Sequence, residues 1–144
     1  MGIFRAEEER AVRELLAEVE RPVELALVLG PYETTTLAGA REIDPEAETR
    51  AILAGIAELC AFVTVSEHPE GSFGAERYPA TVVLRDGVDT GIRFYGTPWG
   101  YELTSLVGAV LEAGKEASSL APESLEALAA LDRDLALQVF VTPT

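Results

Sequence analysis

Apolar residues recur along the chain with two periods, one typical of helices and one typical of strands. The first group follows the i, i+3, i+4, i+7 spacing of an amphipathic helix: Val12, Leu15, Leu16 and Val19. The stretch V-E-L-A-L-V-L that follows at 23–29 is mostly apolar, which favours a buried strand. Continued in this way, the pattern predicts helices at about 5–20, 44–60 and 101–113 and a last one from 121, and strands at 23–29, 62–65, 80–84, 91–95 and 137–144.

Turn and cap residues divide these segments. Asp44-Pro45-Glu46 has the order of N-cap, first-turn proline and early acid that starts a helix, and Asp86-Gly87 is a strong hairpin signal. Residues 32–43 and 67–77 are rich in polar residues and glycine, which indicates loops. In the last helix, the leucine spacing predicts that one stripe faces inward: Leu125, Leu128 and Leu131.

The order of the elements favours one fold. A strand-helix-strand unit followed by a hairpin and a covering helix is typical of an α/β (α+β) thioredoxin-like fold, a mixed central sheet flanked by helices. Pro79 directly precedes a hairpin strand, where this fold places a proline after a cis peptide bond. The backbone beside such a proline can pair with an extended substrate, so Tyr78, Pro79 and Ala80 are candidates for a substrate groove. The alternative is an ordinary proline at the start of a strand.

Composition and charge exclude several classes of function. The 144 residues suffice for one compact domain, and a net charge of −14 should repel nucleic acid. Neither a signal peptide nor a long apolar run is visible, so we expect a soluble cytoplasmic protein without membrane contact. The chain has no Asn, and Arg outnumbers Lys ten to one. That bias fits either a thermophile or a GC-rich genome.

The chemistry-bearing residues are few. Cys60 is the single cysteine, which excludes an intramolecular disulfide, a C-x-x-C pair and a cysteine zinc cluster. Its place at the end of a helical apolar stripe favours a small buried hydrophobe over a reactive thiol. His68 is the single histidine and has no second metal ligand near it in sequence. We therefore predict no catalytic residue, metal or cofactor in this chain.

One turn sequence carries a family resemblance. The segment at 96–107, G-T-P-W-G-Y-E-L-T-S-L-V, contains a G-x-P-x-G-[HY]-E-[FL] turn entering a helix. Together with residues 78–114 it resembles the first thioredoxin-like unit of the two-unit protein disulfide oxidoreductases, the glutaredoxin-like proteins of thermophiles. It is equally similar to the N-terminal domain of the flavoprotein subunit of alkyl hydroperoxide reductase. Trp99 in this turn fits either packing at the helix entry or a partner surface.

The resemblance implies a division of the chain. Residues 1–116 would form a thioredoxin-like unit lacking C-x-x-C, and 117–144 a helix and a first strand leading toward a second unit that carries the cysteines. Where some relatives have a C-x-x-C in the first unit, the matching stretch here is a degenerate motif: Thr34, Thr35, Thr36 and Leu37. None of these side chains can exchange disulfides, because that reaction requires a thiolate. The chain alone is predicted to be redox-inert.

Two functional hypotheses follow. The first is a non-catalytic unit of a thiol-disulfide oxidoreductase in cell redox homeostasis. It would position a C-terminal C-x-x-C unit and help to hold a polypeptide substrate or redox partner at Pro79. The second is a free-standing thioredoxin-like binding or scaffold protein, a homodimer through the terminal strand. Whether the native protein is an enzyme stays open at this point.

Overall fold

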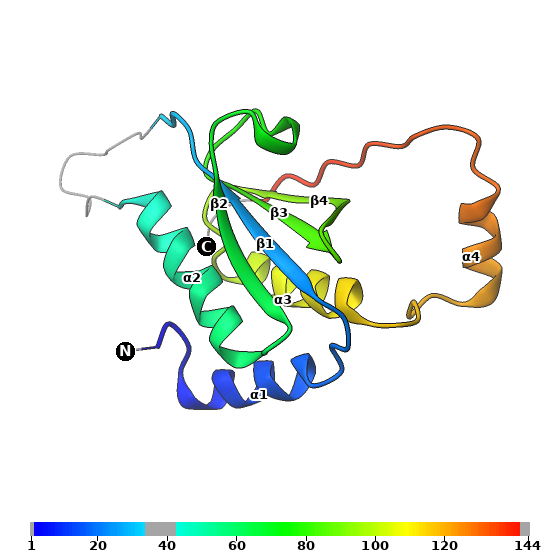
Figure 1. Cartoon of the computed structure of the whole chain (residues 1–144), viewed down its shortest axis with the longest axis horizontal. Helices are drawn as coiled ribbons and strands as arrows, with labels where there is room; N and C mark the ends of the chain where they lie inside the picture. Colours follow the sequence, from blue (N-terminus) through cyan, green and yellow to red (C-terminus); the bar gives the residue numbers. More distant parts are fainter. Residues whose placement is uncertain (1, 34–42, 142–144) are drawn as a thin grey trace.

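The computed structural model of the protein describes residues 2–33 and 43–141. Within them, four strands form one mixed sheet in the order β2-β1-β3-β4 (Figure 1). Their bounds are β1 Val23–Val28, β2 Val63–His68, β3 Ala80–Arg85 and β4 Val88–Tyr95. Strand β1 pairs parallel with β2 and antiparallel with β3, which in turn pairs antiparallel with β4. The predicted strand-helix-strand unit and the hairpin are both present.

Four α-helices accompany the sheet in the described residues. They are α1 Ala6–Leu16, α2 Pro45–Leu59, α3 Tyr101–Gly114 and α4 Pro122–Ala129, with a short 3-10 turn, η1, at Ser72–Gly74. Helix α2 begins as predicted, because the Asp44 carboxylate accepts a hydrogen bond from the Ala47 N–H at 3.0 Å. The hairpin turn also matches its prediction. Asp86 and Gly87 have φ of 50° and 78°, the left-handed conformations that a tight two-residue turn requires.

The main core lies between one face of the sheet and helices α1, α2 and α3. Leu25 and Leu27 of β1 point toward these helices and are fully buried. Their partners in the main core include Ile52, Leu53, Ile56, Leu106 and Val110. Ala26 and Val28 point to the other face, where Phe73 and Tyr78 pack on a second apolar cluster. The strands β1 and β3 are therefore buried on both sides, which explains their continuous apolar sequences.

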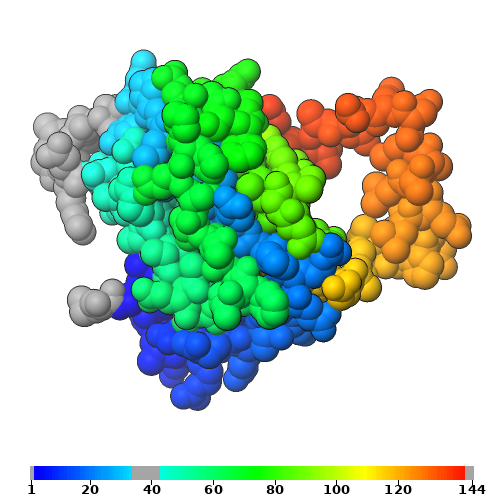
Figure 2. All heavy atoms as spheres, in the orientation of Figure 1, coloured from blue at the N-terminus to red at the C-terminus, as the bar shows by residue number. Residues whose placement is uncertain are grey.

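The segment after α3 differs from the prediction. Helix α4 has no buried residue, and Leu125, Leu128 and Leu131 are 43%, 52% and 47% exposed rather than turned inward. Figure 2 shows α4 projecting from the body of the molecule and the segment after it returning toward the body, where residues 135–141 line a cavity with β4. Helical spacing indicates which side chains share a face, but it does not provide a surface to cover that face. The core is closed by the sheet and the other helices without α4.

The predicted terminal strand is also absent from the described residues, which end at 141. Residues 137–141 have no strand assignment, and Leu137, Val139 and Phe140 are 90%, 86% and 79% exposed. A strand needs a neighbour for its backbone hydrogen bonds, and no described strand pairs with this segment. Residues 142–144 lie outside the description. The division at 116 and 117 stays a prediction.

Smaller differences concern element boundaries. Helix α1 ends at Leu16 rather than near residue 20, and β2 continues to His68, into residues predicted as a loop. The extension of β2 follows from its register, since Leu27 pairs with Glu67 and Val28 with His68. Among the described residues, no helix is long and apolar enough to cross a membrane.

Candidate functional site

The predicted groove residues lie where β3 begins. The peptide bond between Tyr78 and Pro79 is cis, as predicted. The Pro79 carbonyl accepts a hydrogen bond from the Gly96 N–H at 2.8 Å. Ala80 is fully buried and pairs with Val28 on one side and with Tyr95 on the other. Pro79 and Ala80 are thus fixed by the sheet, and a binding role for the groove stays a proposal.

Tyr78 fastens the loop before β3. Its hydroxyl donates to the Ala75 carbonyl at 2.7 Å and accepts from the Gly71 N–H at 2.9 Å. Its ring lies against Gly30, the second residue after β1, where an added Cβ would stand 2.5 Å from the ring carbon Cδ2. Tyr78 thereby connects the end of β1 to the loop of residues 69–79.

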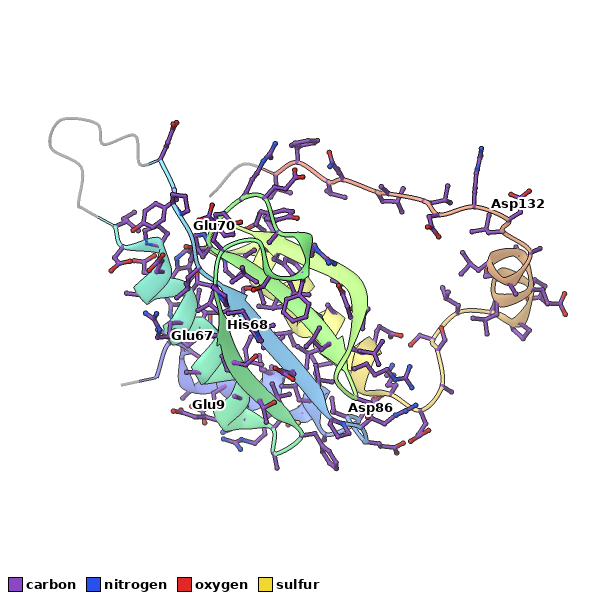
Figure 3. All side chains as sticks on the ribbon, turned by 45° about the horizontal axis from the view of Figure 1, so that its top comes forward. Glu9, Glu67, His68, Glu70, Asp86 and Asp132 are labelled. Carbon is purple, nitrogen blue, oxygen red and sulfur yellow. The ribbon has the colours of Figure 1, made fainter. Side chains whose placement is uncertain are left out.

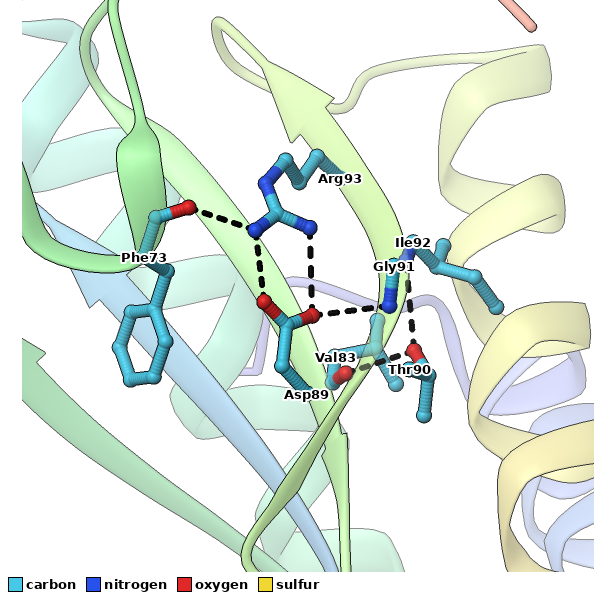
Figure 4. Close-up of polar contacts among 7 residues, drawn as sticks. All are labelled: Phe73, Val83, Asp89, Thr90, Gly91, Ile92 and Arg93. Atoms are coloured by element: carbon cyan, nitrogen blue, oxygen red, sulfur yellow. Dashed lines mark hydrogen bonds and ion pairs between the residues drawn. The ribbon is translucent and has the colours of Figure 1, made fainter. Parts of the chain in front are cut away.

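Arg93 of β4 holds the same loop from the other side (Figure 4). Its guanidinium donates to both oxygens of Asp89, at 2.6 and 3.2 Å, and to the Phe73 carbonyl at 2.5 Å. The Gly91 N–H adds a 2.8 Å hydrogen bond to Asp89. Burial disfavours the ionised carboxylate, but the hydrogen bonds from Arg93 and Gly91 and the charge of Arg93 outweigh it, so the pKa of Asp89 is lowered. We call Arg93, Asp89 and Phe73 the arginine clasp.

The clasp coincides with an irregularity in the outer strand. Val82 pairs with Arg93 and Leu84 with Asp89, so three residues of β4 face the single Val83. The Thr90 hydroxyl donates to the Val83 carbonyl at 2.7 Å and accepts from the Ile92 N–H at 3.3 Å. The side chains of Asp89 and Thr90 thus bond backbone N–H and carbonyl groups that in a regular strand would be available to a neighbouring strand. The bulge makes the first half of β4 a poor edge for further pairing.

The start of α2 meets the turn that leads into α3. Thr49 is fully buried, and its hydroxyl donates to the Pro45 carbonyl at 2.6 Å and lies 3.2 Å from the Thr97 hydroxyl. The Trp99 indole donates to a Glu48 carboxylate oxygen at 3.0 Å, while the side chain is 42% exposed. Trp99 therefore packs at the helix entry and also presents surface, so both interpretations of this residue are consistent with its place.

Cys60 lies at the opposite end of α2. The helix has 15 residues, so its two ends are separated by about 22 Å. Cys60 is buried, and its thiol approaches the Leu16 carbonyl at 3.8 Å. This confirms the prediction of a small buried side chain. The predicted degenerate motif, Thr34 to Leu37, lies outside the described residues.

His68 lies at the end of β2, on the sheet face away from α2 (Figure 3). Its Nε2 is 2.8 Å from the Ser66 hydroxyl and 3.8 Å from a Glu24 carboxylate oxygen, and its ring meets the Phe73 ring edge-on at 5.0 Å. The described residues contain no group of three side chains suited to hold a metal ion. Through its ring contact with Phe73, His68 packs against the 69–79 loop.

A cavity of about 730 Å³ lies between β4, the start of α3 and the segment 135–141. Glu76, Arg77, Arg93, Tyr95 and Glu102 contribute polar or aromatic lining. Burial raises the pKa of Glu102 above its ordinary value. The apolar part of the lining includes Leu137, Val139 and Phe140 of the C-terminal segment, which are largely exposed.

Comparison with known proteins identifies the fold. No family model matches the chain. It is 28% identical over 130 residues to the alkyl hydroperoxide reductase AhpF of Staphylococcus epidermidis, and 33% identical over 125 residues to that of Escherichia coli. The structure matches the N-terminal domain of AhpF from Enterococcus faecalis with a TM-score of 0.75 and 25% identity, over 90% of this chain and 62% of that one. The chain is a thioredoxin-like unit similar to this N-terminal domain.

A second structural match supports the same fold. A protein disulfide oxidoreductase from Aeropyrum pernix gives a TM-score of 0.66 at 23% identity, over 88% of this chain and 55% of that one. The predicted resemblance to both families and the predicted fold are confirmed. The two AhpF sequences are covered over 25% and 21% of their length, so this chain spans about a quarter or less of these relatives.

Sequence reasoning missed the contacts that fix the site. The arginine clasp joins residues up to 20 positions apart, and the Trp99–Glu48 hydrogen bond spans 51 positions. No local sequence motif predicts either contact. The one available signal was the hairpin itself, which places Asp89 and Arg93 on the same strand and the same face.

Proposed function

We propose that this chain is a non-catalytic thioredoxin-like unit that supports a C-x-x-C unit in a cytoplasmic thiol-disulfide redox system. In this role it serves cell redox homeostasis by positioning the catalytic unit and by contributing the Pro79 groove to the binding of a polypeptide substrate or redox partner. Similarity to a domain of AhpF, which is by its name part of a peroxide reductase, supports a redox setting.

The observation that carries the proposal is the place of the single thiol. The sequence contains one cysteine, and a dithiol cycle needs a second thiol to resolve the mixed disulfide. Cys60 is also buried. It lies about 22 Å from the start of α2, which is the end of this helix that contacts the turn beside Pro79. A single thiol cannot complete the exchange cycle, and a buried thiol cannot reach a substrate disulfide.

The exposed apolar surface of the chain also favours the role of a supporting unit. Helix α4 and residues 137–141 expose apolar side chains that the body of the unit leaves uncovered. Isolated exposed apolar residues are common, but a run of them on a projecting segment favours an interaction with another unit. The relatives that this chain matches are about four times its length, which leaves room for such a unit.

A chimaera tests the supporting role. The 125 matching residues of Escherichia coli AhpF would be replaced by this chain, and peroxide reductase turnover would be compared with the native protein and with a version lacking those residues. We expect the chimaera to recover turnover relative to the shortened version. Turnover equal to the shortened version, in a chimaera that is folded by circular dichroism, would contradict the supporting role.

The alternative, a free-standing scaffold that forms a homodimer, is favoured by one observation. The exposed Leu137, Val139 and Phe140 could pair with the same segment of a second copy. Sedimentation velocity over a hundredfold range of concentration distinguishes the two roles. The scaffold predicts a dimer that a Val139→Lys and Phe140→Lys double variant dissociates, whereas the supporting unit predicts a monomer throughout.

A further inference from the structure

The larger polar aromatic residues of the chain gather at one end of the sheet. The sequence has four tyrosines and one tryptophan: Tyr32, Tyr78, Tyr95, Trp99 and Tyr101. Tyr95 is the last residue of β4, and the others lie shortly after the ends of β1 and β4 or shortly before the start of β3. The opposite end of the sheet, with the β1 start and the Asp86-Gly87 turn, has no Tyr or Trp.

Short contacts connect these residues into one region. Gly30, two positions before Tyr32, packs on the Tyr78 ring. The Pro79 carbonyl accepts from the Gly96 N–H, which follows Tyr95. Tyr95 and Glu102 line the same cavity, and the Glu102 N–H donates to the Trp99 carbonyl at 3.2 Å. We call Tyr95, Trp99 and Tyr101, with the carboxylates of Glu48 and Glu102, the aromatic end.

The aromatic end is exposed for side chains of this size. Tyr95 is 44%, Trp99 42% and Tyr101 84% exposed. Tyr101 begins α3 and contributes nothing to the main core. Large aromatic rings are costly to leave in water, and Tyr and Trp are the residues most often found at the energetic centre of protein interfaces.

Carboxylates accompany the rings. Glu48 accepts from the Trp99 indole, and Glu102 lies in a site where burial disfavours its negative charge. Glu33, Glu46 and Glu76 flank the same end in sequence. Of the two arginines lining the cavity, Arg93 is already paired with Asp89. Arg77 also lines the cavity. Among the described residues, however, neither Glu48 nor Glu102 takes part in an ion pair, so a cation from a partner would meet aromatic rings beside these two carboxylates.

We propose that the aromatic end binds an arginine- or lysine-rich segment of a polypeptide partner. The inference rests on the proposed function, because it names the chemistry of the polypeptide partner that the unit would bind at the aromatic end. Guanidinium groups stack on Tyr and Trp rings and pair with carboxylates. The net charge of −14 attracts such a segment from a distance, whereas it repels a second copy of this chain.

The single tryptophan makes the test direct, because the fluorescence of Trp99 reports on this surface alone. The probe is an acetylated peptide of about ten residues with alternating Arg and Ala and no aromatic residue. Its control has Glu in place of Arg. We expect a saturable change of Trp99 emission with the Arg peptide, weakened about tenfold when salt rises from about 50 to about 300 mM, and no change with the Glu peptide.

Substitutions separate the aromatic end from general electrostatic attraction. Tyr101→Ala and Glu102→Gln should each weaken binding by about fivefold or more. Phe62→Ala is the control, because Phe62 is an aromatic residue just before β2 at the other end of the sheet, and its exposure of 45% is close to that of Tyr95 and Trp99. It should bind the Arg peptide as the native chain does. Circular dichroism verifies that each variant is folded.

Three results would overturn the inference: no saturable binding of the Arg peptide up to about 1 mM, equal binding of the Glu peptide, or a loss in Phe62→Ala as large as in Tyr101→Ala. Since the titration involves no thiol reaction, each of these results leaves the redox-inert role untouched. Conversely, reductase activity of the chain would overturn that role and leave the peptide titration unaffected.

Discussion

Gly30 lies so close to the Tyr78 ring that no side chain fits between them. A Cβ on Gly30 would stand 2.5 to 2.7 Å from three ring carbons. The ring cannot move aside easily, because its hydroxyl is hydrogen-bonded to both Gly71 and Ala75. We predict that Gly30→Ala lowers the free energy of unfolding by about 1–3 kcal/mol through overpacking, measured by urea denaturation.

Gly108 provides the control for this substitution. It lies inside α3, and a Cβ there would meet no atom within 4 Å. Gly108→Ala should therefore stabilise the protein by about 0.5–1 kcal/mol. In a Tyr78→Ala background the cost of Gly30→Ala should largely disappear. A Gly30→Ala variant as stable as the native chain would show that the contact is not restrictive.

The arginine clasp should make stability depend on pH. The folded protein lowers the pKa of Asp89 below its ordinary 3.8, so the folded state binds this proton less tightly than the unfolded chain. The resulting stabilisation is present above pH 3.8 and is lost as the pH falls through the folded pKa. We predict that Asp89→Asn lowers the free energy of unfolding by about 1–2 kcal/mol at pH 7, and that the difference shrinks below pH 3.8.

Denaturation of both proteins across the acid range measures this difference. Asp132→Asn is the control, because Asp132 is exposed on the projecting segment after α4 (Figure 3). It should follow the native curve at every pH. If Asp89→Asn destabilises the protein equally at neutral and strongly acidic pH, the clasp does not act through the ionised carboxylate.

The segment after residue 116 should be dispensable for the stability of the body. Helix α4 has no buried residue, and the apolar side chains at 137, 139, 140 and 141 are more than half exposed. We predict that a chain of residues 1–116 unfolds within about 3 °C of the full chain, because surface changes cost little. Leu16→Ala, at a core residue of α1 that is 2% exposed, should cost about 2–5 kcal/mol. A similar loss in the shortened chain would place α4 in the folding unit.

Much of the fold could be predicted because the decisive signals are local. Continuous apolar runs identified β1 and β3, Asp44-Pro45 marked the start of α2, and Asp86-Gly87 marked the hairpin. The environment of Cys60 followed from its helical stripe. Pro79 followed from its position in the predicted fold, and its cis peptide bond is present.

The incorrect predictions have one physical origin. A sequence pattern shows which side chains share a face, but it does not show which other part of the chain packs against that face. The leucine stripe of α4 and the apolar run at 137–141 predicted burial, but the described residues offer them no cover. The polar end of β2 was assigned to a loop, although pairing with β1 keeps it in the sheet. The arginine clasp was missed because Phe73 and Arg93 belong to different elements.

The central claim, that the chain is redox-inert, is tested most directly by the reduction of insulin disulfides with dithiothreitol as the electron donor. The single buried Cys60 cannot complete a dithiol cycle. We therefore predict that the precipitation rate of insulin equals that with dithiothreitol alone, and that Cys60→Ala gives the same rate. A rate that rises in proportion to the native chain and falls to the background in Cys60→Ala would contradict the claim.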